Sequence, residues 1–239
     1  MSKKSGYTVV EIPKISVQKL AEYMASSQTR QRSILRDCKF QRKEQIFQHS
    51  AAKRYISKYF DEAKSIEWLS SQAEKLNSLE PNTEYKRRKN RNDCNFLFSY
   101  VKNFPSYKLP PADVIVEKKN KTIKLNGVII TFNPDLLLKR DAKNKNYQEI
   151  GAVMIHHTKG LRNSDEIYRY QTALMFNILN LLNNDSGYVA NKKLCIVIDA
   201  LRGNIICAPS ASVRIFKEIQ SACESIVGIW DTLKPPKDY

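Results

Sequence analysis

The sequence has 239 residues, of which 42% are hydrophobic and 10% aromatic, so the chain has enough apolar side chains for a folded core. No apolar run approaches the roughly 18–20 residues of a membrane span, and the first residues lack a signal-peptide pattern, so a cytoplasmic protein is expected. With 40 lysines and arginines against 24 acidic residues, the formal net charge is +16, which is typical of chains that bind nucleic acid.

The first half of the chain is predicted to be helical. Ser16 can cap a helix in which Val17, Leu20, Ala21 and Met24 share one face. Apolar residues recur at helical spacing in three further segments, 49–60, 62–79 and 96–104. Because Pro110 and Pro111 end this pattern, we expect a helical, basic N-terminal region over residues 1–110.

The apolar pattern changes to that of strands after residue 111. Two apolar runs, 121–125 and 128–132, flank Asn126-Gly127, and Asn-Gly between such runs is a strong hairpin signal because both turn positions need positive φ. The second strand is expected to continue to Lys139. A third strand over 147–157 then completes an antiparallel meander.

The remaining elements alternate between helix and strand. Helices are predicted over 164–182 and 211–230, a buried strand over 194–199, and a return strand over 204–208. The order is therefore helices, three strands, a helix, two strands and a helix, which indicates an α/β chain with a mixed sheet. We expect residues 111–239 to form this mixed-sheet core with its C-terminal helix.

Cysteine and histidine limit the metal chemistry that the chain can support. The five cysteines are widely spaced without a CxxC pair, which excludes zinc-finger spacing and a complete disulfide framework. The three histidines, His49, His156 and His157, exclude a histidine-rich metal site. Carboxylates or the adjacent histidine pair would have to hold any metal.

Four short motifs lie at ordered places in these predicted elements. They are Pro134-Asp135 on the second strand, His157-Thr-Lys159-Gly160 at the end of the third, Tyr170-Gln171 in the following helix, and Ser16-x-x-x-Leu20-x-x-Tyr23 near the start. With the order helix, three-strand meander, helix, strand, they resemble the PD-(D/E)XK nuclease superfamily and its RecB-like group. The core resemblance covers residues 112–200, and the Cys-Pro that the group carries after its first motif is missing.

The resemblance implies a restriction-endonuclease-like core and a metal-dependent nuclease site. Members hold a divalent ion, usually Mg²⁺, between two acidic residues, and a lysine orients the attacking water. By this resemblance the candidate catalytic residues are Asp135, His157, Lys159 and Gln171, and the candidate metal ligands are Asp135 and Glu149. Mg²⁺ or Mn²⁺ is the expected cofactor if the chain is catalytic.

These residues also have other interpretations, and Lys159 can equally be a phosphate-binding or plain surface lysine. Asp135 can shape the entry to a strand, and Glu149 can be a solvated charge near the hairpin loop. Gln171 shares the inward stripe of its predicted helix and can be a buried structural amide with a hydrogen-bond partner.

Strand pairing decides which side chains can meet Asp135. Paired residues of an antiparallel hairpin have a constant sum of residue numbers. If Leu138 faces Glu149, Asp135 faces Ala152, and Met154 lies two residues further on. The acidic and lysine positions of the motif then hold apolar side chains.

A second pairing starts from Lys159. His157 then takes the acidic position, opposite Ile130, which itself replaces the expected aspartate. His156 and His157 must point to opposite faces of the sheet, so at most one of them can face a site. Either pairing lacks a required group, and an incomplete catalytic motif is expected.

Basic residues cluster in two runs of the first half. Arginine and lysine neutralise phosphates, and interleaved aromatic residues can stack on bases. We expect Lys86–Arg91 to be a phosphate-contacting loop, with a solvated helix face as the alternative. The candidate nucleic-acid contacts are Arg30, Arg32, Arg36, Arg42, Lys43, Lys86, Arg87, Arg88, Lys89 and Arg91.

The expected function is therefore that of a nucleic-acid-binding protein similar to the PD-(D/E)XK superfamily, with DNA favoured over RNA and no membrane partner. If it is catalytic, the resemblance implies a divalent-metal-dependent nuclease that hydrolyses phosphodiesters in prokaryotic defence or mobile-element biology. The first alternative is a catalytically inactive nucleic-acid-binding or assembly subunit with other protein partners. The second alternative is a protein–protein adaptor or inhibitor with a basic face.

Overall fold

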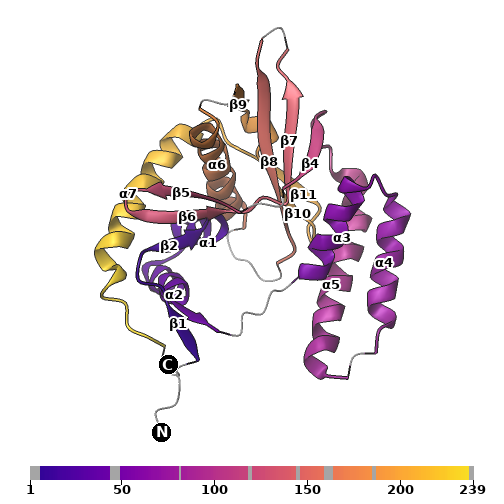
Figure 1. The fold of residues 1–239 in the computed structure, drawn as a ribbon, viewed down its shortest axis with the longest axis horizontal. Coiled ribbons are helices and arrows are strands. Elements are labelled where there is room, and N and C mark those ends of the chain that lie inside the picture. Colours follow the sequence, from indigo (N-terminus) through magenta and orange to yellow (C-terminus); the bar gives the residue numbers. More distant parts are fainter. Residues whose placement is uncertain are drawn as a thin grey trace.

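The computed structural model describes residues 6–43, 49–80, 82–117, 120–143, 146–158, 164–184 and 187–236. Within them the chain is a mixed α/β structure. A central sheet separates one group of helices, α1, α2, α6 and α7, from a second group, α3, α4 and α5 (Figure 1). No helix of this described part is long and apolar enough to cross a membrane.

The central sheet has the strand order β11-β10-β8-β7-β4. Its middle strands, β7 and β8, pair antiparallel, and β8 pairs parallel with β10 across the crossover helix α6. The edge strands β4 and β11 are antiparallel to their neighbours, and β9 adds a short parallel pairing to β8. The bounds are β4 Asp113–Val116, β7 Leu136–Asp141, β8 Gln148–His156, α6 Ser164–Leu182, β9 Tyr188–Ala190, β10 Ile196–Asp199 and β11 Asn204–Cys207.

The predicted Asn-Gly hairpin is confirmed, but it lies outside the central sheet. Strands β5 (Lys121–Leu125) and β6 (Val128–Phe132) pair antiparallel, with φ of 44° at Asn126 and 84° at Gly127. Strand β6 also pairs parallel with β2 (Lys14–Ser16), which completes a three-stranded sheet.

The continuation of the second strand to Lys139 is wrong. The chain leaves one sheet after Phe132 and enters the other at Leu136. Pro134 lies in this break, where its missing N–H could not continue a strand ladder. The meander of the central sheet is therefore β4, β7 and β8, with the β5–β6 hairpin inserted between the first two.

Residues 6–43 pack with the second half of the chain. Helices α1 (Val17–Met24) and α2 (Gln28–Lys39) share a hydrophobic core with β6, α6 and α7 (Ser212–Trp230). The buried Lys39 donates to the carbonyl of Trp230 at 2.8 Å, and the Trp230 indole donates to the carbonyl of Val10. A short ribbon of β1 (Tyr7–Val9) and β3 (Phe40–Arg42) closes this segment.

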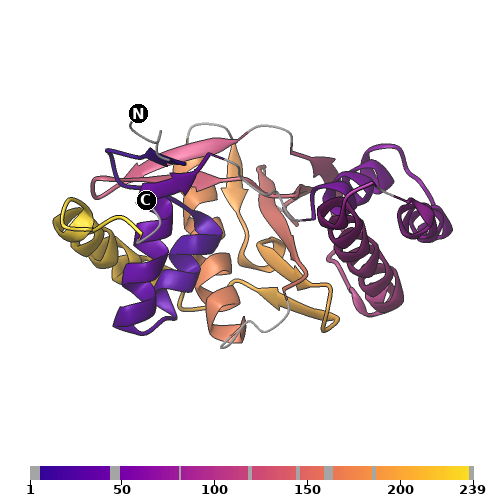
Figure 2. The ribbon, with the colours of Figure 1, turned by 90° about the horizontal axis from the view of Figure 1, so that it is seen from below.

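Helices α3 (Ser50–Asp61), α4 (Ile66–Ser78) and α5 (Glu84–Asn103) cover the other face of the central sheet (Figures 1 and 2). Their apolar residues, among them Phe96 and Tyr100, form a second core with Leu136, Val153 and Ile155. The helical first half is therefore not one packing unit, because residues 6–43 and the α3–α5 group lie on opposite faces of the sheet.

The backbone of the basic run 86–91 is also different from the expectation. Lys86–Arg91 is not a loop, because it forms the first turns of the 20-residue helix α5. Thr83 caps this helix by accepting a hydrogen bond from the backbone N–H of Lys86. The helical stripe that we expected from residue 96 thus begins a full three turns earlier.

Candidate functional site

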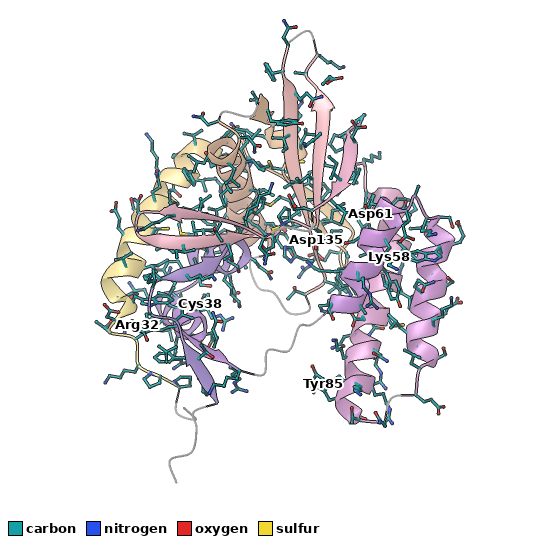
Figure 3. The ribbon with its side chains drawn as sticks, viewed as in Figure 1. Arg32, Cys38, Lys58, Asp61, Tyr85 and Asp135 are labelled. Carbon is teal, nitrogen blue, oxygen red and sulfur yellow. The ribbon has the colours of Figure 1, made fainter. Side chains whose placement is uncertain are left out.

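Asp135 lies at the break between the two sheets, next to the α3–α5 group (Figure 3). Lys53 of α3 places its Nζ 2.9 Å from Oδ1 and 3.0 Å from Oδ2 of this carboxylate. Oδ2 also accepts the backbone N–H of Ile155 at 2.7 Å. The two oxygens of Asp135 are therefore held by one ammonium group and one strand amide.

The observed register differs from both predicted pairings. Leu136 pairs with Val153, which puts Met154 opposite Asp135, two residues beyond the expected Ala152. The second pairing is also wrong, since Ile130 pairs with Ile123 and not with His157. The strand position opposite Asp135 therefore holds an apolar side chain.

Glu149 does not join Asp135. It pairs with Arg140 in the register, and its Oε2 accepts from Arg140 Nε at 2.7 Å. Glu149 and Met154 are five residues apart on β8, which corresponds to about 16 Å along an extended strand. The proposed ligand pair Asp135 and Glu149 is thus contradicted, because two carboxylates so far apart cannot bind one ion.

The donor set at Asp135 does not fit a divalent metal ion. Mg²⁺ and Mn²⁺ prefer several oxygen ligands, whereas here one carboxylate is paired with an ammonium group. In the described part of the chain there is no group of three or more His, Cys, Asp or Glu side chains that could hold a metal. Lys159, the lysine of the motif, lies outside the described residues.

The two adjacent histidines face opposite sides of the sheet, as predicted. His157 lies against α5, where its Nε2 is 3.1 Å from the hydroxyl of Ser99 and its ring stacks on Phe96 with centroids 5.1 Å apart. His49 adds an edge-on ring contact to the same cluster. His157 therefore belongs to the packing between sheet and α5, while it also forms part of a cleft wall.

His156 points the other way, toward α6. Its Nε2 is 2.8 Å from Nε2 of Gln171, and its ring stacks on Tyr168. Burial, reinforced by the positive charge of Lys53, lowers the pKa of His156 to about 4, although Asp135 and Asp199 act in the opposite direction. His156 is therefore a neutral imidazole at physiological pH.

Gln171 is fully buried on the inward face of α6. Its Nε2 donates to Met154 Sδ at 3.0 Å in addition to contacting His156, whereas its Oε1 has no hydrogen-bond partner. This amide fixes the orientation of His156 behind the strand. Gln171 has no hydrogen bond to Asp135, and its candidate catalytic role stays a prediction.

A cleft of about 950 Å³ opens beside Asp135, between the core and the α3–α5 group. Its walls come from the first turn of α1, the start of α3, the middle of α5, and the ends of β6 and β8. Lys19 and Lys53 are its charged lining residues, and no carboxylate lines it in the part of the chain that is described. Both lysines are ion-paired, Lys53 with Asp135 at 2.9 Å and Lys19 with Glu22 at 2.8 Å, and neither carboxylate lines the cleft. The charged groups that this described lining presents to a ligand are therefore ammonium groups.

The predicted nucleic-acid contacts lie on either side of this region. Figure 3 labels Arg32 on α2 and Tyr85 in the first turn of α5, and the two lie on opposite sides of Asp135. Among the first group, Arg30 pairs with Glu22, and Arg32 and Arg36 line a groove of about 770 Å³ with the C-terminal segment. Arg42 contacts Tyr7, and Lys43 is exposed beside it.

The second group is a solvated helix face. Lys86, Arg87, Arg88 and Arg91 are exposed, Lys89 is half-buried, and Arg87 pairs with Glu84. The outcome matches the alternative that we considered for this run. None of these residues lines the cleft at Asp135.

Sequence reasoning missed Lys53. It is one of two adjacent basic residues in a predicted helix, and no motif marks it. Its proximity to Asp135 depends on the packing of α3 against the sheet, which brings together residues 82 positions apart.

A comparison with known families finds no model that matches the chain, and a search of curated proteins finds no similar one.

Proposed function

We propose that the chain is a nucleic-acid-binding protein and that its binding site is the cleft beside Asp135. The observation that carries this proposal is a cleft whose charged lining residues, within the described part of the chain, are two lysines, in a protein of net charge +16. Phosphates of a nucleic-acid backbone are the polyanion that such a cleft fits best. The basic helices α2 and α5 on either side would extend the contact beyond the cleft.

We further propose that the core is of the PD-(D/E)XK type. The order β4, β7, β8, α6, β10 follows the meander, helix and strand of that superfamily, and Asp135 lies at the start of the second strand. This arrangement supports a nuclease as the second candidate function. Binding without cleavage is favoured, because Met154 lies opposite Asp135 and Glu149 lies at the far end of β8.

Binding and cleavage assays separate these candidates. Fluorescence anisotropy with single- and double-stranded DNA and RNA, over a range of salt, should show binding that weakens steeply as salt increases. The same substrates with Mg²⁺ or Mn²⁺ should remain intact. Cleavage that is lost in both Asp135→Ala and Lys159→Ala would instead establish the nuclease, and no binding to any nucleic acid would favour the adaptor or inhibitor.

A further inference from the structure

Lys53 separates Asp135 from the cleft. The Lys53 side chain lines the cleft and is 37% exposed, whereas the Asp135 side chain is 14% exposed and does not line it. An anion that enters the cleft therefore meets an ammonium group, with the carboxylate behind it. The carboxylate fixes the position of the ammonium, and the ammonium cancels the charge that would repel a phosphate.

The ammonium group of Lys53 keeps a hydrogen-bond donor for a ligand. An ammonium has three N–H groups, and two can serve the two oxygens of Asp135. Among the described residues, Lys53 has no other hydrogen-bond acceptor. One N–H is therefore available on the side of the cleft.

His156 supplies a second donor on the cleft wall. An amide nitrogen can only donate, so with Gln171 Nε2 at 2.8 Å, His156 Nε2 accepts and the imidazole proton is assigned to Nδ1. This residue is only 6% exposed, lines the cleft, and has no partner for Nδ1 among the described residues. This N–H can therefore donate to a ligand or a water molecule in the cleft.

The first turn of α1 forms the facing wall. Ser16 to Lys19 line the cleft there, and the first N–H groups of a helix have no acceptor within the helix. Ser16 accepts the N–H of Lys19, so one of these groups already has a partner, and the positive end of the helix dipole lies at the lining residues. This wall favours an anion, in agreement with the two donors opposite.

We propose that Lys53 takes the place of a divalent metal ion as the cation beside Asp135, and that the cleft binds a backbone phosphate of nucleic acid directly. This inference rests on the proposed function and adds to it the residues that contact the phosphate and the expectation that binding does not require a metal ion. Lys53 and His156 donate to the phosphate oxygens, and the first turn of α1 faces them. Asp135 acts as a positioning residue for Lys53.

Oligonucleotide binding by the wild type and three variants tests this proposal. Affinities are measured by anisotropy in EDTA and in Mg²⁺ at matched ionic strength. The wild type should bind equally in both. Lys53→Met should weaken binding about tenfold, the effect of losing one charge-assisted hydrogen bond, and should reduce the salt slope by about one phosphate contact.

Lys58→Met is the matched control, because Lys58 lies on the same helix, is 51% exposed and pairs with Glu62 rather than with Asp135. Its affinity should stay within about twofold of the wild type, as expected for a weak surface ion pair. Asp135→Asn should bind as tightly as the wild type or more tightly, since the amide oxygen can still accept from Lys53 while the negative charge that repels a phosphate is removed. Thermal melts confirm that each variant is folded, and the double variant Lys53→Met/Asp135→Asn avoids an unpaired carboxylate.

Two results would overturn the proposal while leaving nucleic-acid binding intact. Binding that needs Mg²⁺ and loses this dependence in Asp135→Asn would assign a metal to Asp135. Equal affinities of Lys53→Met and Lys58→Met would place the phosphate elsewhere. Failure of the wild type to bind any nucleic acid would overturn the proposed function together with this inference.

Discussion

Acid should destabilise this protein through His156. The side chain is buried against α6 and its pKa is lowered to about 4, mainly by burial and then by Lys53, while Asp135 and Asp199 partly oppose the shift. An unfolded chain leaves this imidazole with a pKa near 6.5. Below pH 6.5 the unfolded state therefore binds a proton that the folded state does not bind.

The size of the effect follows from the difference between the two pKa values. The stability that His156 contributes is fully present above about pH 6.5 and is lost as the pH falls toward 4. A difference of about 2.5 units corresponds to about 3 kcal/mol in total. Between pH 7.5 and pH 5, about 2 kcal/mol of this should already be lost.

Urea unfolding at pH 7.5, 6 and 5 measures this loss. His156→Gln removes the titrating group and should lose about 2 kcal/mol less than the wild type over this range. Carboxylates that also titrate are present in both proteins, so the comparison isolates His156. His49→Gln is the comparison variant, because His49 is half-buried and its pKa is also lowered, mainly by burial, so it reports the effect of removing a less buried histidine. Parallel stability curves for wild type and His156→Gln would refute the reasoning.

Two further predictions concern the packing around Gly151 and the buried hydrogen bond of Asp93. Gly151→Ala should destabilise the fold by about 3 kcal/mol or more, because a Cβ there would lie 2.1 Å from Leu194 Cβ and 2.2 Å from its carbonyl oxygen. Gly228→Ala, which meets nothing within 4 Å in helix α7, should stabilise by about 0.5–1 kcal/mol, and the opposite order of the two melting temperatures would contradict the packing argument. Asp93→Ala should lower the free energy of unfolding by about 1–2 kcal/mol, because Asp93 of α5 is buried and accepts the Ala52 N–H in the first turn of α3. Chemical denaturation measures this loss. An Asp93→Asn variant no more stable than Asp93→Ala would argue against a stabilising role for this hydrogen bond.

Local signals predicted the elements that depend on neighbouring residues. The Asn126-Gly127 turn, the helix over 164–182 and the opposite orientation of His156 and His157 follow from backbone preference or strand alternation alone. The same signals cannot separate β6 from β7, since both strands contain apolar runs and only their sheet partners differ. Pro134, which belongs to the Pro134-Asp135 motif, is also the sign of the break between them.

Long-range packing decides what the sequence could not. A register shift of two residues keeps every side chain on its predicted face, so hydrophobic alternation cannot detect it, yet it moves Met154 opposite Asp135. The charge run 86–91 is helical because Thr83 caps it and Phe96, Leu97 and Tyr100 are buried further along the same helix. Solvent exposure of the basic face makes the density of positive charge tolerable without a phosphate partner.

Two sets of basic residues in the first half differ in their surroundings, the exposed clusters on α2 and α5 and the cleft residue Lys53. Residues 1–110 carry 22 lysines and arginines against 11 acids, yet the exposed clusters on α2 and α5 are outside the cleft. Such clusters attract a polyanion over a distance and depend strongly on salt. Lys53 differs from them, because Asp135 fixes its position and limits the conformational entropy lost when a phosphate binds. The α3–α5 group therefore carries the cleft lysine that is held against Asp135. A specific phosphate contact requires this group to pack on the sheet, because that packing places Lys53 beside Asp135.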